Sequence, residues 1–248
     1  MVIDPILEVD GVVAGYGALT VLDGTRFSVQ RGTITTIVGP NGAGKSTVFK
    51  VAFGLLPARA GSVALDGREI TNRPPRALLA LGLAYVPQGR NLFPELSVRH
   101  NLELGGITIK DRAELARRID AVTERFPMLR DKAGAQASTL SGGQQKILEI
   151  ARALLLEPRL MLVDEPSIGL SPILVGEVFG ILQELRRRGV TVLMVEQNAR
   201  SALAISDDAV VLEQGRTSMT GPADEILSDP RVGRLFLGGG TAAASAGR

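Results

Sequence analysis

Runs of consecutive apolar residues are the clearest pattern along the chain. Three of them lie at residues 33–38, 160–163 and 190–195. Their side chains are apolar at successive positions rather than at alternate ones, which is typical of parallel strands that are covered on both faces. An apolar stripe between the last two runs predicts a helix that ends at the basic, glycine-terminated segment 186–189. This alternation predicts an α/β domain with a parallel sheet.

Two other segments have different patterns. Residues 90–155 are mostly helical in pattern, with charged faces such as 111–125 and no clear strand, and we interpret them as a helical subdomain inserted into the α/β core. In the first thirty residues glycines separate short apolar runs, which predicts a layer of antiparallel strands. We therefore expect one domain over residues 1–237, followed by a flexible tail of small and polar residues, 238–248.

Composition narrows the possible functions. The 248 residues include no cysteine, which excludes disulfides and thiolate metal sites. The formal net charge of +2 gives no reason to expect nucleic acid as a partner. The longest uncharged apolar run, residues 77–87, is about half of the roughly 20 residues that a membrane-spanning helix needs. We expect a chain that does not cross a membrane itself but could lie against a membrane protein.

The segment 39–47, GPNGAGKST, fits the phosphate-loop pattern G-x-x-x-x-G-K-[ST]. It follows a predicted strand and opens a predicted helix, a context that an accidental glycine turn would not require. Glycines let the backbone N–H groups point at phosphate oxygens, while Lys45 can reach the terminal phosphates and the Ser46 hydroxyl can hold Mg²⁺. The candidate nucleotide-binding residues of this loop are Gly39, Asn41, Gly42, Gly44, Lys45, Ser46 and Thr47.

A second candidate site is the pair Asp164 and Glu165, which ends the apolar run 160–163. Ligands bind at the carboxyl ends of strands in parallel sheets. Asp164 is placed to hold Mg²⁺, and Glu165 is placed to polarise an attacking water. The alternative is a strand that runs out into a solvated acidic turn, and the neighbouring phosphate loop argues against it.

The segment LSGGQ, which includes Ser141, Gly142, Gly143 and Gln144, precedes a strongly amphipathic helical pattern. Ser141 and Gln144 could simply form a capping box at the start of that helix. However, each glycine in the first turn costs about 1 kcal/mol relative to alanine. Such glycines would be useful if an anion approached the bare backbone N–H groups. On these residues alone both interpretations remain open.

Taken together, these motifs resemble those of the ATP-binding cassette (ABC) ATPases. GPNGAGKST, LSGGQ and LMLVDEP occur in the order of that family, and LSGGQ is diagnostic of it. Gln88, in YVPQ, matches the glutamine of the Q-loop, and Tyr16 matches the aromatic residue that stacks on adenine. The resemblance covers about residues 6–237. It implies a P-loop NTPase (RecA-like) core with an antiparallel β layer and a helical subdomain.

The resemblance also implies a mechanism, with ATP and Mg²⁺ as cofactors. Two ATPase chains pair head to tail, so that Ser141, Gly142, Gly143 and Gln144 of one cover the ATP held by Lys45 and Ser46 of the other. Gln88 contacts Mg²⁺ or water, and residues 89–96 contact a permease unless they form a plain loop. The implied partners are two transmembrane permease subunits, a sister ATPase or a second copy, and a separate extracytoplasmic solute-binding protein. The implied location is peripheral, at the cytoplasmic face of the cell membrane.

Longer stretches narrow the resemblance to the importer branch. YVPQGRNLFPELSV, DEPSIGLSP and VEQNARSAL resemble the shorter ATPase of branched-chain amino acid importers. ATPases of urea importers share much of this sequence. Because the transported solute never touches the ATPase, physical reasoning does not separate urea importers from branched-chain amino acid importers. Two further alternatives are a non-transport ABC ATPase and a nucleotide-binding regulator that does not hydrolyse. The first is disfavoured because the chain has one cassette and an insertion of ordinary length, and intact Lys45, Asp164 and Glu165 argue against the second.

The sequence departs from the commonest family pattern at two places. Residues 168–171, Ile-Gly-Leu-Ser, replace the usual Ser-Ala-Leu-Asp, which removes an aspartate from a cross-dimer contact. Gln197 stands where a histidine is usual; its amide can donate to a phosphate oxygen and accept from water but cannot become cationic. We predict a competent ATPase in which Glu165 and Gln197 are catalytic and Glu165 carries most of the water activation. The single histidine, His100, is expected to be an exposed surface residue.

Overall fold

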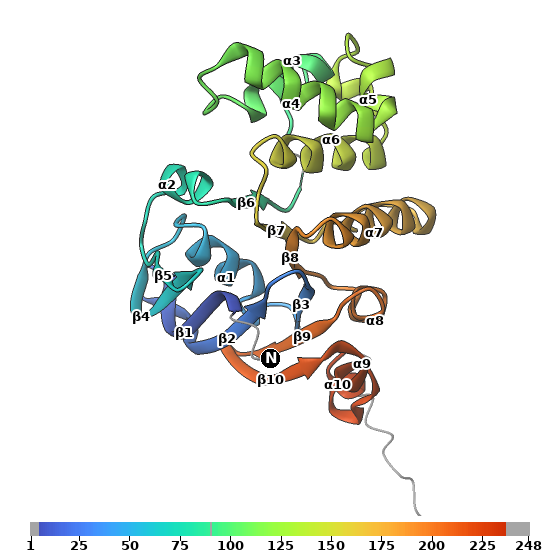
Figure 1. The fold of residues 1–248 in the computed structure, drawn as a ribbon. Helices are drawn as coiled ribbons and strands as arrows, with labels where there is room; N and C mark the ends of the chain where they lie inside the picture. The colour runs from blue at the N-terminus through green and yellow to red at the C-terminus, as the bar shows by residue number, and fades with distance from the viewer. Residues whose placement is uncertain (1–4, 90, 237–248) are drawn as a thin grey trace, which may run out of the picture.

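The structure is a computed structural model, and it describes residues 5–89 and 91–236. Within these residues the strands form two sheets (Figure 1). The smaller sheet has the order β2-β1-β4-β5 and is antiparallel throughout. Its strands are β1 (Pro5–Tyr16), β2 (Leu19–Gln30), β4 (Ala58–Leu65) and β5 (Arg68–Glu69). The predicted antiparallel layer is therefore confirmed, and it extends beyond the first thirty residues.

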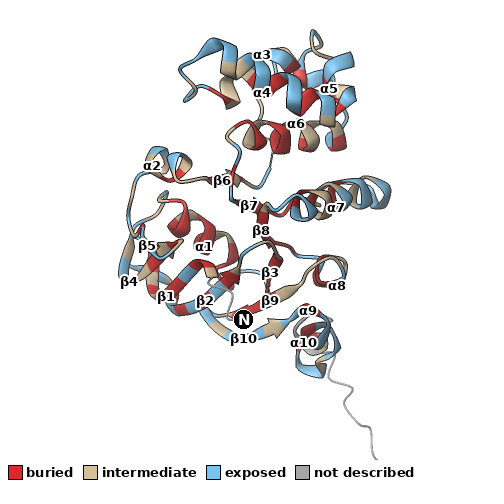
Figure 2. Ribbon diagram, viewed as in Figure 1, coloured by how far each residue is buried: buried red, intermediate tan, exposed pale blue. Residues whose placement is uncertain are grey.

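The larger sheet has six strands in the order β10-β9-β3-β8-β7-β6. All neighbours are parallel except β10, which pairs with β9 in the antiparallel sense. The strands are β3 (Ile34–Val38), β6 (Leu83–Val86), β7 (Leu160–Asp164), β8 (Thr191–Val195), β9 (Asp208–Glu213) and β10 (Arg216–Pro222). Every residue of β3, β7 and β8 is buried, as their unbroken apolar character predicted (Figure 2).

Successive residues of a strand in this sheet belong to different hydrophobic cores. In β7, Leu160 and Leu162 join the core shared with the antiparallel layer, whereas Met161 and Val163 join the core on the opposite face. Both faces of the strand are covered, so both sets of side chains have to be apolar. This two-sided burial is the physical reason for the consecutive apolar runs in the sequence.

Helices cover the larger sheet and form a separate layer beyond it (Figure 1). They are α1 (Lys45–Ala52), α2 (Pro75–Ala80), α3 (Val98–Gly105), α4 (Arg112–Arg125), α5 (Pro127–Asp131), the 3₁₀ turn η1 (Ala137–Thr139), α6 (Gly142–Leu154), α7 (Pro172–Arg187), α8 (Ala199–Leu203), α9 (Ala223–Ser228) and α10 (Pro230–Phe236). The described residues of the predicted insertion contain α3 to α6 and no regular strand. His100 lies in α3 and is exposed, as predicted.

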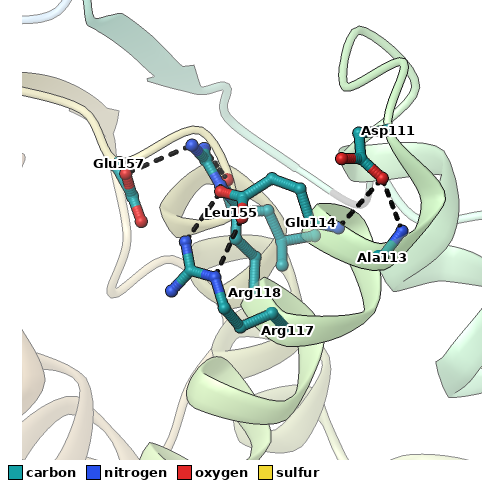
Figure 3. A network of polar contacts seen from close by, with 7 residues as sticks. All are labelled: Asp111, Ala113, Glu114, Arg117, Arg118, Leu155 and Glu157. Atoms are coloured by element: carbon teal, nitrogen blue, oxygen red, sulfur yellow. Dashed lines mark hydrogen bonds and ion pairs between the residues drawn. The ribbon is translucent and has the colours of Figure 1, made fainter.

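A polar network fastens α4 to the end of α6 (Figure 3). Arg118 donates to the carbonyl of Leu155 over 2.9 Å and forms ion pairs with Glu114 and Glu157. Arg117 forms a second ion pair with Glu114. Because Leu155 follows the last residue of α6, Arg118 satisfies a carbonyl that the helix leaves without an intrahelical partner.

Some elements were not expected from the sequence. Strand β6 lies inside the apolar run 77–87, which also contains most of α2, and no polar residue marks the boundary between them. Strands β4, β9 and β10 were not predicted either. The predicted tail, 238–248, lies outside the described residues. Over the part of the chain that the structure describes, no helix combines the length and the apolar character needed to cross a membrane.

Candidate functional site

The site forms where three neighbouring parallel strands end. Strands β3, β8 and β7 are adjacent in the sheet and run in the same direction, so the loops that follow them leave from the same edge. These loops carry the phosphate-loop motif, the turn with Gln197, and the pair Asp164 and Glu165. The sheet topology therefore brings together segments that are more than 100 residues apart in sequence.

The phosphate loop curls around its own lysine. The Nζ of Lys45 donates to the carbonyls of Gly39 and Pro40, over 2.8 and 3.0 Å. The side chain is buried, and desolvation lowers the pKa of Lys45, partly offset by Glu165 and Asp164. Helix α1 begins directly at Lys45, and its first turn has no side-chain cap. Its free N–H groups and the lysine make this loop a site for an anion such as phosphate.

Gly44, the residue before α1, is a position at which this loop requires glycine. Its φ of 99° lies in the region that residues with a side chain rarely adopt. A Cβ atom there would also approach Cδ2 of Leu22 to 2.7 Å. The conformation and the close approach both exclude larger residues, so the glycine is needed for the shape of the loop.

Asp164 is a buried carboxylate beneath the phosphate loop. Its Oδ1 accepts from the Ser46 hydroxyl and its Oδ2 from the Tyr85 hydroxyl, each over 3.1 Å. Burial raises the pKa of Asp164, while these two hydrogen bonds act in the opposite direction. Burial also raises the pKa of Tyr85, and the neighbouring Asp164 charge raises it further. Tyr85 therefore stays a hydroxyl donor at neutral pH.

Glu165 lies in a left-handed backbone conformation, with φ of 46°. This conformation costs on the order of 1–3 kcal/mol for a residue other than glycine. This backbone conformation ends the alternation of side-chain directions along strand β7. The side chain of Glu165 therefore lines the same hollow as the phosphate loop, whereas Asp164 contacts Ser46. Its Oε2 accepts from Gln88 Nε2 over 2.7 Å, and Gln197 Nε2 lies 3.1 Å from both of its oxygens.

The hollow at this edge has a volume of about 310 Å³. It is lined by Val21, Asn41, Gly42, Gly44, Lys45, Ser46, Thr47, Glu165 and Gln197. Gln88 is joined to it through Glu165. Tyr16 does not line the hollow; it is 45% exposed at the end of β1, and its hydroxyl accepts from Lys50. Six of the thirteen residues predicted to bind nucleotide therefore line one hollow, with Tyr16 at the surface nearby.

The LSGGQ residues do not line this hollow. They open helix α6, where Ser141 and Gln144 form the capping box, with hydrogen bonds of 3.2 and 3.3 Å. Lys132 also donates to the side chain of Gln144. A Cβ atom on Gly143 would lie 2.6 Å from Cδ2 of Leu174, so a larger residue there would displace this side chain of α7. The capping box thus accounts for Ser141 and Gln144 within one chain, but it does not account for the two glycines.

Three residues of the site were not singled out from the sequence. They are Tyr85, which holds Asp164, and the pair Ser167 and Glu196, which joins the loops after β7 and β8. The usable signal was position, because Tyr85 and Glu196 lie at the carboxyl ends of β6 and β8. The sequence alone did not show that β6 is a strand next to β7, so Tyr85 had no predicted neighbour.

A family model for ABC transporters matches residues 22–168, which is more than half of the chain. The chain belongs to the ABC transporter family. As a member of that family it binds and hydrolyses ATP. The fold predicted from the motifs, a P-loop core with an antiparallel layer and a helical subdomain, is confirmed.

Individual relatives cover nearly the whole ATPase. It is 41% identical to the high-affinity branched-chain amino acid transport ATP-binding protein BraG of Pseudomonas aeruginosa, with 94% of this chain and 100% of that protein covered. It is also 41% identical to the probable branched-chain amino acid transport ATP-binding protein LivF of Archaeoglobus fulgidus, over 91% and 95% of the two chains. The lipopolysaccharide export system ATP-binding protein LptB of Escherichia coli is 35% identical, over 94% and 97%.

A solved structure supports the same assignment. The ATPase matches a nucleotide-free ATP-binding cassette from an ABC transporter with a TM-score of 0.86 and 31% identity, covering 95% of this chain and all of that one. The relatives found by sequence and the solved structure therefore indicate the same family over nearly the whole chain.

Proposed function

We propose that the hollow beside the phosphate loop is the ATP site and that Glu165 is the general base of hydrolysis. The observation that carries this proposal is the placement of the Glu165 carboxylate. It lines the hollow together with Lys45 and Ser46, and two glutamine amides hold it there. A base has to lie within hydrogen-bond reach of the water that it activates, on the side of the terminal phosphate.

The remaining residues divide the work of binding. Lys45 and the N–H groups at the start of α1 bind the terminal phosphates. Ser46 and Asp164 supply the hard oxygen ligands that suit Mg²⁺, which is commonly held by one or two protein groups together with substrate phosphates. When bound there, Mg²⁺ neutralises charge on the β- and γ-phosphates. The exposed ring of Tyr16 is available to stack on adenine.

Gln197 acts through Glu165 in this proposal. The sequence predicted that its amide contacts phosphate and water, whereas in the structure its Nε2 faces both oxygens of Glu165. An amide donor fixes the carboxylate without taking its charge, so Glu165 can still accept a proton. Gln88 donates to the same carboxylate from the other loop, which adds a second restraint.

For the whole system we propose an importer of branched-chain amino acids, with this chain peripheral at the cytoplasmic face of the membrane. The names of the two relatives with 41% identity support that solute class. Two permease subunits and a separate solute-binding protein complete the assembly. Ser141, Gly142, Gly143 and Gln144 of a sister ATPase, or of a second copy, cover the bound ATP. Ile168 and Ile173, which are 45% and 78% exposed on either side of Leu170, support an apolar contact between ATPase chains.

A substitution of Glu165 tests the catalytic assignment. Glu165→Gln keeps the shape and the hydrogen-bonding length of the side chain but removes the base. We expect ATP to bind with an affinity close to that of the unaltered protein while turnover falls at least about 100-fold, the lower end of what a positioned base contributes. The control is Glu157→Gln, an exposed carboxylate at the network of Figure 3, which should leave turnover unchanged. Retained turnover in Glu165→Gln contradicts the assignment.

Purification from the membrane tests the transport assignment. If the proposal is correct, the tagged chain brings with it a permease pair and a second ATPase, and an encoded binding protein that accompanies them binds leucine, isoleucine or valine. Isolation with lipopolysaccharide-export components instead would favour the export function named for LptB.

A further inference from the structure

Glu196 is a buried carboxylate at the end of β8, and it is only 1% exposed. Three groups donate hydrogen bonds to it. The backbone N–H of Ser167 reaches Oε1 over 2.8 Å, and the Ser167 hydroxyl reaches Oε2 over 2.8 Å. The backbone N–H of Gln197 also reaches Oε2, over 3.1 Å. No ion pair involves Glu196 among the described residues, so neutral dipoles rather than a cation solvate this carboxylate.

The two residues that Glu196 holds belong to the two catalytic turns. Ser167 follows Glu165 by two residues in the loop after β7, and Gln197 is the next residue after Glu196 in the loop after β8. A further bond joins these loops, from the N–H of Glu165 to the carbonyl of Val195, over 2.9 Å. Glu196 therefore connects, through two atoms of one carboxylate, the turn that carries Glu165 to the turn that carries Gln197.

Burying a carboxylate without a cation is costly, and the protein core does not require one here. The neighbours of Glu196 at the ends of β3 and β7 show that this edge of the sheet is otherwise built from apolar strands and site residues. A polar group that is expensive to bury and fully hydrogen-bonded fixes one arrangement of its partners, because any other arrangement leaves donors or oxygens unpaired. Here those partners are the backbones of the catalytic turns.

We propose that Glu196 is a positioning residue for ATP hydrolysis: by holding Ser167 and Gln197 together, it sets the distance between the Gln197 amide and the Glu165 carboxylate. The equal distances from Gln197 Nε2 to the two oxygens of Glu165 are the result of this connection. Glu196 itself does not line the hollow beside the phosphate loop. The proposal rests on the function of Glu165 proposed above, and it adds the residue that orients the Glu165–Gln197 pair.

Two substitutions of Glu196 separate positioning from general damage to the fold. Glu196→Ala removes both carboxylate oxygens and the hydrogen bonds that they accept, and we expect kcat to fall about 10- to 100-fold, the loss typical of misplaced catalytic groups. The affinity for ATP should change less than about threefold, because Glu196 does not line the hollow in which we propose that ATP binds. Glu196→Gln keeps both hydrogen bonds to Ser167, because its oxygen can accept from the Ser167 N–H and its NH₂ group can donate to the Ser167 hydroxyl, whereas the bond from the Gln197 N–H is lost. It should therefore recover a substantial part of kcat.

A double-mutant cycle tests whether Glu196 acts through Ser167. Ser167→Ala removes the hydroxyl contact but keeps the backbone one, so its loss of kcat should be smaller than that of Glu196→Ala. The double variant should lose no more than Glu196→Ala alone, because both changes remove the same connection. The matched control is Glu213→Gln, a carboxylate at the end of β9 on the same sheet, which should leave kcat and KM unchanged.

Several outcomes overturn the proposal. They are a kcat within twofold of the unaltered protein in Glu196→Ala, losses in the two single variants that multiply in the double variant, or an equal loss of ATP affinity and of kcat. If Glu196→Gln is as impaired as Glu196→Ala although it melts at the same temperature as the unaltered protein, positioning is also refuted. Retained turnover in Glu165→Gln, with a reduced kcat in Glu196→Ala, would refute the function of Glu165 while leaving the connection between the loops in place.

Discussion

Two groups of ion pairs fix helix α6, and they differ in their exposure to water. In the middle of the helix, Lys146 and Glu149 form a pair of 2.5 Å with side chains 7% and 5% exposed. At its end, Arg118 pairs with Glu114 over 2.5 Å and with Glu157 over 3.3 Å, and Glu157 is 61% exposed (Figure 3). Because the ion-pair distances are comparable, the difference in exposure to water determines how much each group contributes to the stability of the fold.

This difference in exposure determines how much each group of ion pairs can stabilise the fold. Exposed ion pairs contribute at most about 1 kcal/mol, and salt screens them. A buried pair is costly to form, but the loss of one partner leaves an uncompensated charge in the core. The buried pair also reaches the site, because Glu149 accepts the backbone N–H of Asn91 over 2.7 Å, three residues after Gln88. The inner pair, Lys146 and Glu149, thus orients a loop of the site. The outer network, formed by Glu114, Arg117, Arg118 and Glu157, fastens α4 to the end of α6.

The largest expected effect comes from breaking the inner pair. Lys146→Ala leaves Glu149 buried and unpaired, and it should lower the free energy of unfolding by about 3–5 kcal/mol. Urea denaturation measures this loss, which should be nearly the same at low and high salt. As a control, Lys146→Met combined with Glu149→Gln removes both charges and keeps an acceptor for Asn91, and it should recover most of the stability. A loss below about 1 kcal/mol in Lys146→Ala would place the inner pair in the same class as the outer network.

A smaller effect is expected at Tyr85, which is buried but uncharged. Tyr85→Phe removes the donor to Oδ2 of Asp164 and leaves that carboxylate with the Ser46 hydroxyl alone. Loss of a hydrogen bond to a charged group should lower the free energy of unfolding by about 1.5–3 kcal/mol. The same urea measurement on nucleotide-free protein checks it. Tyr16→Phe is the matched control, because that hydroxyl is exposed and bonds to Lys50; equal losses in both variants would contradict the importance of burial.

Arg118→Ala tests the outer network. It removes two ion pairs and the bond to the Leu155 carbonyl, yet every charged side chain of the network is at least partly exposed, so the loss should stay near or below about 1 kcal/mol. The loss should shrink further as salt is raised from 0.05 to about 0.5 M, since the screening length falls below about 10 Å above 0.1 M. Arg112→Ala, at an exposed residue of the same helix, is the control and should change little. A loss that is large and insensitive to salt would show that the network behaves like the inner pair.

The same contrast explains which features the sequence could predict. Strands β3, β7 and β8 are buried on both faces, and this burial forces a recognisable apolar run that ends in a motif. The positions of Lys45, Ser46, Asp164 and Glu165 followed from the direction of those strands. Contacts such as Lys146–Glu149 have no comparable signature, because an i,i+3 ion pair has the same sequence whether it is exposed or buried.

Other features depended on packing that no local pattern records. Tyr85 could not be assigned to Asp164, because the register of β6 against β7 was unknown. The orientation of Gln197 toward Glu165 required the connection through Glu196 and Ser167, which are 29 residues apart. The uniformly apolar run 77–87 did not show where α2 ends and β6 begins, because both elements bury apolar side chains.

The smallest effect, and the most selective test of the outer network, is its dependence on pH. Hydrogen bonds from Arg117 and Arg118 lower the pKa of Glu114 from 4.5 to about 2. Because the pKa is lower in the folded state than in the unfolded one, the stability from this carboxylate is fully present above pH 4.5. It is lost as the pH falls through that value toward about 2.

Comparison with Glu114→Gln isolates this contribution. Above pH 5 the unaltered protein should have a slightly higher urea midpoint than the variant, and the gap should narrow steadily as the pH is lowered to 3. High salt should reduce the gap at every pH, because Glu114 and its two arginine partners are all at least partly exposed to solvent. In Lys146→Ala the corresponding gap should persist at high salt, because water and ions do not reach the buried Glu149. A gap for Glu114→Gln that stays constant between pH 5 and 3 would show that the carboxylate is not held by the two arginines in solution.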